Sequence, residues 1–144
     1  MMSPYDAIID SVRSDLVRLN FVLETDEGAG MTFRRGKFTL DFNTEQYYHP
    51  TLQSLLGYAD ESGQQEQFHV ATVMRVMAPS LLLQLRTRFD HQTYEGTKDA
   101  LKFEIQFLET YETEIFSDPP SYGNACREAE VEDLRRAGFN VGDD

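Results

Sequence analysis

The chain has 144 residues, of which 25 are Asp or Glu and 13 are Lys or Arg, so its formal net charge is -12. This surplus argues against nucleic acid as a partner, because phosphate groups repel carboxylates, and it favours cations or basic proteins. A length of 144 residues predicts a single domain, residues 1–144, with a sizeable core. Acidity also serves solubility, and that second interpretation of the charge stays open.

The cysteine content and the apolar pattern bear on the compartment. Cys126 is the only cysteine, which excludes an intramolecular disulfide and fits a reducing cytosol. No apolar run reaches the length of a membrane span, and the N-terminus lacks the charged and apolar segments of a signal peptide. We therefore expect a cytoplasmic protein that does not contact a membrane.

Residues 4–18 are expected to form the first helix. Ser3 supplies an N-cap hydroxyl, and Pro4 suits the first helical position, where its missing N–H costs nothing. The apolar residues that follow recur at helical spacing and predict one buried face. They are Ile8, Ile9, Val12, Leu16 and Leu19.

From residue 21 onward the apolar pattern changes to a period of two. After an acidic, Gly-rich turn at 26–30, apolar and polar residues alternate from 31 to 42, with Gly36 in the middle. Alternation with a central glycine predicts an antiparallel hairpin that has one buried and one wet face. Residues 52–58 fit either a further strand or, by the spacing of their leucines, a helix.

Helical spacing returns after the polar residues 60–65 and continues to the end of the chain. Capping and breaking residues set the expected bounds of these later helices. The segments are residues 70–77 with a short continuation from Ser80, residues 97–116 with Thr97 as N-cap, and residues 122–137, which stop at Gly138.

This order of elements predicts an α+β fold. We expect an N-terminal helix, an antiparallel β-meander of three to four strands, and C-terminal helices packed on one face of the sheet. The sequence has no internal repeat and no low-complexity tract that would argue for another architecture.

Residue types that carry metal binding or nucleophilic catalysis are scattered along the chain. His49, His69 and His91 lie at no recurrent ligand spacing, so we expect no metal and no cofactor. Cys126 lies in a mostly acidic segment, which disfavours the reactive thiolate. The sequence therefore predicts a protein that is not an enzyme.

The glutamates of the 97–116 helix are the remaining candidates for acid–base chemistry. Paired carboxylates can divide acid and base roles when burial raises the pKa of one above the other. We see no apolar burial in this pattern and interpret the set as a solvated helix face. The set is Glu104, Glu109, Glu112 and Glu114.

The basic residues Arg34, Arg35 and Lys37 are the one place where positive charge gathers. They could hold a phosphate, but at a hairpin tip a solvated turn or a salt bridge to surrounding acid is the commoner role. A nucleic-acid surface would need more basic residues and fewer acids.

The segment 44–50 contains Tyr47, Tyr48 and His49 and closes with a proline. Tyrosine is favoured in recognition surfaces because it gives a large contact area at low entropic cost. A tyrosine packed on the sheet edge is the equally weighted alternative. We name these three residues as candidates for partner binding.

Negative charge is concentrated in the last third of the chain. Residues 1–100 hold fourteen acids and nine bases, whereas residues 101–144 hold eleven acids and four bases. If the C-terminal helices share a face, that face would steer a cationic partner. Its candidate residues are Glu109, Glu112, Glu128, Glu132 and Asp133.

The architecture resembles that of small bacterial immunity proteins of polymorphic toxin systems. The resemblance is carried by the capped N-terminal helix, the alternating segment MTFRRGKFTLDF and the helix that ends FLETYETEIF. It implies a small cytosolic binder that occludes the active site of a cognate toxin. No single motif is diagnostic, and the resemblance assigns no residue.

Two functions follow as hypotheses. The first is a non-enzymatic, acidic domain that binds a basic protein, with neutralisation of a toxin as the expected role. The second is a domain of another role that binds a small molecule between the sheet and the helices.

Overall fold

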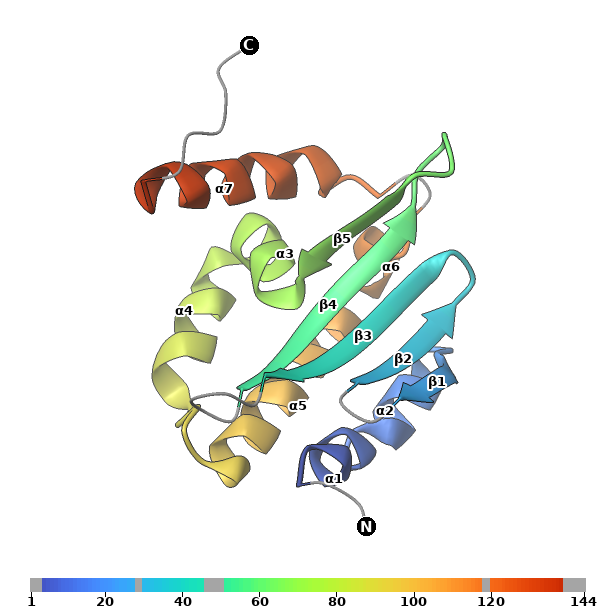
Figure 1. The fold of residues 1–144 in the computed structure, drawn as a ribbon, viewed down its shortest axis with the longest axis vertical. Helices are drawn as coiled ribbons and strands as arrows, with labels where there is room; N and C mark the ends of the chain where they lie inside the picture. Colours follow the sequence, from blue (N-terminus) through green and yellow to red (C-terminus); the bar gives the residue numbers. More distant parts are fainter. Residues whose placement is uncertain (1–3, 28–29, 46–50, 118–119, 139–144) are drawn as a thin grey trace.

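The computed structural model describes residues 4–27, 30–45, 51–117 and 120–138. These residues form an α+β fold in which helices lie at both ends of the chain and a sheet lies between them (Figure 1). The predicted fold class is confirmed.

The described residues form one five-stranded antiparallel sheet in which each strand pairs with the next along the chain. The meander is therefore confirmed, and its strand number is higher than the three to four expected. The strands are β1 (Val22–Glu27), β2 (Gly30–Arg35), β3 (Phe38–Glu45), β4 (Thr51–Ala59) and β5 (Gln65–His69).

The hairpin of β2 and β3 follows the predicted alternation. Phe33 pairs with Leu40, and Arg35 pairs with Phe38 across the turn. Gly36 has a φ of 59°, a left-handed conformation that glycine adopts without strain.

The strand interpretation of residues 52–58 is correct, because residues 51–58 of β4 pair with β3. β5 was not expected at all. Its sequence QEQFH is polar apart from Phe68, the one side chain of this strand that is buried in the core. A short edge strand with one inward apolar residue carries almost no periodic signal.

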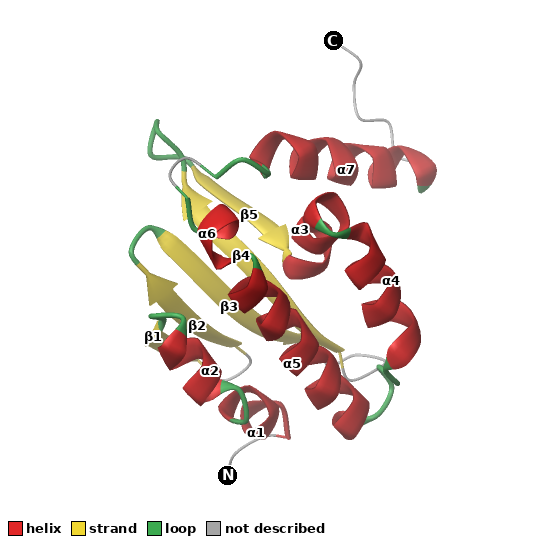
Figure 2. Ribbon diagram, turned by 180° about the vertical axis from the view of Figure 1, so that it is seen from behind, coloured by secondary structure: helices red, strands yellow, loops and turns green. Residues whose placement is uncertain are grey.

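The helices at the N-terminus and in the middle of the chain cover one face of the sheet. Figure 2 shows α1, α2, α5 and α6 in front of the strands, whereas α3, α4 and α7 lie beyond the β5 edge. The bounds are α1 (Pro4–Asp10), α2 (Arg13–Arg18), α3 (Val70–Met77), α4 (Pro79–Arg88), α5 (Tyr94–Thr110), α6 (Glu112–Ile115) and α7 (Gly123–Arg136).

The predicted helix 4–18 is divided into α1 and α2. The Val12 amide donates to the Ile9 carbonyl, and the Ser11 hydroxyl donates to the Ile8 carbonyl, so the backbone tightens between the two helices. The apolar face continues across the break, since Ile8, Val12 and Leu16 are all buried.

The predicted helix 97–116 begins earlier and is also divided. The Thr93 hydroxyl, rather than Thr97, caps α5 by accepting from the Gly96 amide at 3.0 Å. α5 ends at Thr110, and α6 follows after Tyr111. The predicted end of α7 is confirmed by Gly138, which has a φ of 89° just after the helix.

The core lies between the sheet and the helices that cover it. Leu40, Phe42 and Leu56 of the central strands are completely buried, and so are Leu108 of α5 and Leu16 of α2. No described helix lies over the opposite face of the sheet, which is turned to the viewer in Figure 1. That face carries polar side chains such as those of Thr32 and Gln67.

Candidate functional site

The predicted aromatic candidates Tyr47, Tyr48 and His49 lie outside the described residues. The acidic candidates Glu109 and Glu112 lie at the junction of α5 and α6, and each faces an arginine from elsewhere in the fold. Arg18 of α2 lies 3.2 Å from Glu109, and Arg35 of β2 lies 3.0 Å from Glu112.

Arg35 joins three parts of the structure at this junction. Besides Glu112, its guanidinium donates to the Leu19 carbonyl at 3.1 Å and lies 4.3 Å from the centre of the Phe116 ring. Arg34 pairs with Glu24 of β1 at 2.9 Å. Salt bridging, one of the roles considered for the basic residues of this hairpin, is therefore correct for both arginines.

The other acidic candidates lie on α7. Asp133 is 2.8 Å and Glu132 is 3.6 Å from the Arg75 guanidinium of α3, so this pair of carboxylates holds α7 against α3. Glu128 is exposed and forms no ion pair with a described residue. Four of the five acidic candidates thus bind arginines of other elements, two at the junction of α5 and α6 and two on α7.

A cavity lies between the turn ends of the strands and the start of α7. It has a volume of about 540 Å³, within the range of ligand sites. Gly123 is needed at its wall, because a Cβ there would lie 2.3 Å from the Tyr58 hydroxyl. It is lined by Lys37, Tyr58, Asp60, Glu61, Ser62, Glu66, Pro120, Ser121, Gly123, Asn124 and Arg127.

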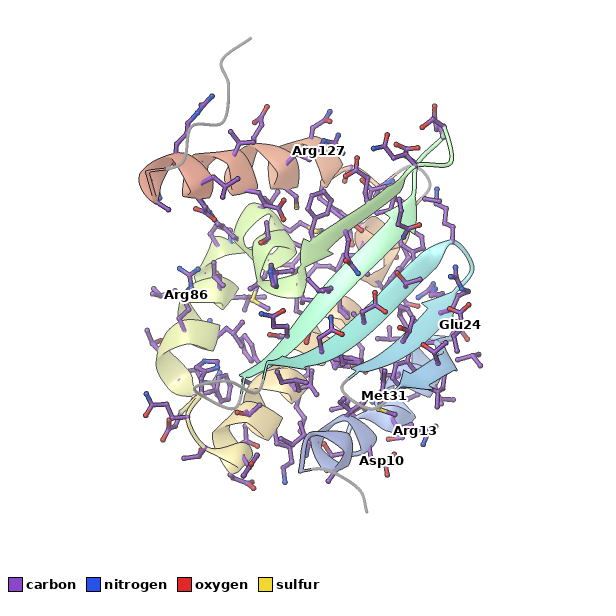
Figure 3. All side chains as sticks on the ribbon, in the orientation of Figure 1. Asp10, Arg13, Glu24, Met31, Arg86 and Arg127 are labelled. Carbon is purple, nitrogen blue, oxygen red and sulfur yellow. The ribbon has the colours of Figure 1, made fainter. Side chains whose placement is uncertain are left out.

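The charges in this cavity largely compensate one another. Arg127, labelled on the first half of α7 in Figure 3, lies 2.8 Å from Glu66 of β5. The Asp60 carboxylate accepts hydrogen bonds from the Ser62 hydroxyl and from two backbone amides of its turn, and these bonds lower its pKa. The cavity is therefore polar without being strongly acidic.

Glu104 of α5 is half-buried as a residue, but its carboxyl group lies inside the fold. Its Oε2 is inaccessible to solvent and has no hydrogen-bond partner among the described residues. Burial raises the pKa of Glu104 to about 7, and a hydrogen bond with Ser54 of β4 opposes part of this rise. Near neutral pH the group is therefore divided between its acid and its carboxylate form.

The interpretation of Glu104 as part of a solvated face is wrong. The sequence held a signal that could have found it, because Glu104 lies three residues after Leu101 and four before Leu108, both buried. Those spacings place it on the apolar face of the helix. Glu114, which is exposed, fits the solvated interpretation.

Three further polar residues lie close to Glu104. A small cavity of about 30 Å³ adjoins its side chain and is also lined by Ser54, His91 and Thr97. His91 Nε2 lies 2.8 Å from the Leu85 carbonyl oxygen, and Ser54 is hydrogen-bonded to Glu104 itself. His91 is therefore engaged by the backbone, and the group in contact with the serine hydroxyl is the Glu104 carboxyl group.

Cys126 is buried in α7, and burial raises the pKa of its thiol to about 12, with the nearby Glu130 acting in the same direction. Its thiol is therefore protonated at neutral pH and has the low reactivity expected from the sequence.

Within the described ranges, no three His, Cys, Asp or Glu side chains are arranged to hold a metal ion. Among the same residues, none of the helices combines the length and the apolar composition that crossing a bilayer requires.

Comparison with protein-family models, with curated proteins and with solved structures finds no significant match to this chain.

Proposed function

We propose that this protein is a non-enzymatic domain that binds a basic protein in the cytoplasm, and that an immunity protein which occludes a basic toxin is the role it fits best. The observation that carries the proposal is the distribution of charged side chains: the arginines are largely paired with carboxylates of the same chain, and many carboxylates are left over.

The arginines of the fold are largely engaged by carboxylates of the same chain. Arg18, Arg35 and Arg75 each bind acidic side chains from a distant element. Because the chain has a net charge of -12, many carboxylates have no basic counterpart within it. Solvent ions or a basic partner must supply the opposite charge.

Some of these surplus carboxylates are well exposed. Glu61, Glu114 and Glu128 form no ion pair with another described residue and lie on different elements of the surface. Exposed charges of this kind increase the rate of encounter with a cationic partner more than they increase the affinity.

The site around Glu104 supports a binding role over catalysis. Its pKa of about 7 suits acid–base chemistry, but the adjoining cavity of about 30 Å³ admits little more than a water molecule.

The test begins with the product of the reading frame directly upstream, because a toxin gene would precede the gene of its immunity protein. With both proteins purified, stopped-flow association is measured across a salt series. We expect the association rate to fall as salt screens the charges over a Debye length of about 8 Å at physiological ionic strength. The dissociation rate should change much less.

Glu114→Lys and Glu128→Lys are the informative variants, because neither side chain forms an ion pair with another residue that the structure describes. Both should slow association, whereas Asp99→Lys, an exposed change at the opposite end of α5 from α6, should slow it less. Tyr47→Ala and Tyr48→Ala should raise the dissociation rate by an amount equivalent to about 1–2 kcal/mol. An association rate that is independent of salt and of all three lysine variants would show that the acidity only serves solubility.

Binding of a small molecule is a second candidate function, favoured by the 540 Å³ cavity between the sheet and α7. A ligand in that cavity should raise the melting temperature without any partner protein. Arg127→Gln should abolish the rise, and Arg13→Gln, at an exposed ion pair with Asp10 on the other side of the molecule (Figure 3), should leave it intact.

A further inference from the structure

The small cavity beside Glu104 lies where the first half of β4 meets the N-terminal half of α5. β5 pairs with residues 55–59 of β4 and not with residues 51–54, so the sheet is narrower here. The cavity measures about 30 Å³, which is enough for a group the size of one water molecule. Its walls are Leu52, Ser54, His91, Thr97, Ala100, Leu101 and Glu104.

The hydrogen-bond donors of these walls are already used inside the protein. The Ser54 hydroxyl is hydrogen-bonded to the Glu104 carboxyl group. The Thr97 hydroxyl donates to the Thr93 carbonyl at 2.7 Å. His91 Nε2 must act as the donor to the Leu85 carbonyl, 2.8 Å away, because a carbonyl oxygen can only accept.

What remains in the cavity is a set of acceptors. Glu104 Oε2 is buried and has no hydrogen-bond partner among the described residues. The hydroxyl oxygens of Ser54 and Thr97 keep free lone pairs after donating their protons. A buried acceptor without a donor costs free energy, and an unpaired carboxylate costs more.

We infer that this cavity binds a primary ammonium group, which donates to Glu104 Oε2 and to the hydroxyl oxygens of Ser54 and Thr97. An ammonium group has three N–H donors and no acceptor, which matches the free acceptors that the described residues present to this cavity. It is about as large as a water molecule, whereas a planar guanidinium group exceeds the volume available. The charge of the group also balances the carboxylate, which water does not.

The site does not depend on the basic protein proposed above, because a free amine and a lysine side chain carry the same group. The ligand is thus a primary ammonium group, and the experiment distinguishes a free amine from the lysine side chain of a partner as its source.

The experiment uses the full chain with ¹³C-labelled glutamate side chains at pH 8 and constant ionic strength. The probes are ammonium, methylammonium, n-butylammonium and tetramethylammonium chloride, with sodium chloride as the reference salt. We expect ammonium and methylammonium to shift the Glu104 carboxyl resonance in a saturable manner. Tetramethylammonium, which has no N–H donor, and sodium should leave it unchanged.

Binding to the carboxylate form should also lower the pKa of Glu104 measured in the same spectra. A ligand present at about ten times its dissociation constant lowers the pKa by about one unit. The carboxyl resonance of Glu114, which is exposed, is the internal control and should not move. Ser54→Ala should weaken the saturable shift, and Glu114→Gln should not affect it.

The result with n-butylammonium, the longest amine of the series, identifies the source of the ammonium group. Saturable binding of n-butylammonium, which mimics a lysine side chain, would identify a lysine of a partner as the natural ligand. Binding of only ammonium and methylammonium would identify a small free amine. If no amine shifts the Glu104 resonance more than sodium does, the cavity holds only water and the inference is wrong.

Discussion

Glu104→Gln is expected to stabilise the protein at pH 8 and to remove much of the pH dependence of its stability between pH 4.5 and 7. The pKa of Glu104 is raised from 4.5 to about 7 in the folded state by burial. Folding therefore favours the protonated form of this group. Glutamine has the same shape and no charge, and its amide supplies donors to a cavity that offers acceptors.

The sign of the effect follows from proton binding. Below about pH 4.5 both the folded and the unfolded state hold the proton, so the carboxyl group does not penalise folding. Between pH 4.5 and 7 the unfolded state loses its proton first, and the free energy of unfolding falls as pH rises. Above about pH 7 the penalty is constant at no more than about 3–4 kcal/mol, since each pKa unit corresponds to about 1.4 kcal/mol.

Urea unfolding of the wild type and of Glu104→Gln at several pH values measures this penalty. The difference between the two free energies of unfolding should be small at pH 4.5 and should reach its maximum above pH 7. Glu114→Gln is the matched control, because its carboxylate is exposed, and its curve should run parallel to that of the wild type. If the free energy of unfolding of Glu104→Gln also runs parallel to that of the wild type across this pH range, the Glu104 carboxyl group is not buried in solution.

Gly96→Ala should destabilise the fold although alanine is the better helix former. A methyl group on Gly96 would place its carbon 1.8 Å from the carbonyl oxygen of Asp90 and 2.6 Å from the carbonyl carbon. Both atoms belong to the backbone, which cannot move aside as a flexible side chain can. The gain in helix propensity is at most about 1 kcal/mol, whereas overpacking of this kind costs about 1–3 kcal/mol and occasionally more.

The same substitution should affect the N-terminal turn of α5 as a whole. The Thr93 cap accepts from the Gly96 amide, and Thr97 binds the Thr93 carbonyl, so a shift at Gly96 reaches the cavity beside Glu104. Glu95→Ala changes an exposed neighbour and should alter stability by less than about 0.5 kcal/mol. The midpoint of urea unfolding of the two variants tests the contrast. A Gly96→Ala variant as stable as the wild type would show that the loop before α5 adapts.

The sequence alone was sufficient for elements whose signal is local. The hairpin of β2 and β3 follows from alternation around Gly36, and the end of α7 follows from Gly138, because both depend on the conformational freedom of one glycine. The buried faces of α1 and α2 also follow from spacing, since Ile8 and Leu16 are apolar at helical intervals.

Elements whose signal is not local were missed or misplaced. β5 has one buried apolar residue, Phe68, and exists because β4 offers it a free edge over residues 55–59. The start of α5 was placed at Thr97 because both Thr93 and Thr97 have the side chain of an N-cap. Thr93 is the N-cap because its hydroxyl donates to the carbonyl of Asp90 and is thereby held where it can accept from the Gly96 amide.

The charged side chains show most clearly which properties follow from the sequence and which depend on tertiary structure. Composition determines that the chain is acidic, and helical spacing already aligned Glu104 with Leu101 and Leu108. Tertiary structure decided which carboxylates are free: Arg18 and Arg35 reach Glu109 and Glu112 from far along the chain, while Glu104 meets Ser54. The charge of a side chain is fixed by its residue type, but its solvation and its partners depend on packing between distant segments, and these set its pKa and its availability to a ligand.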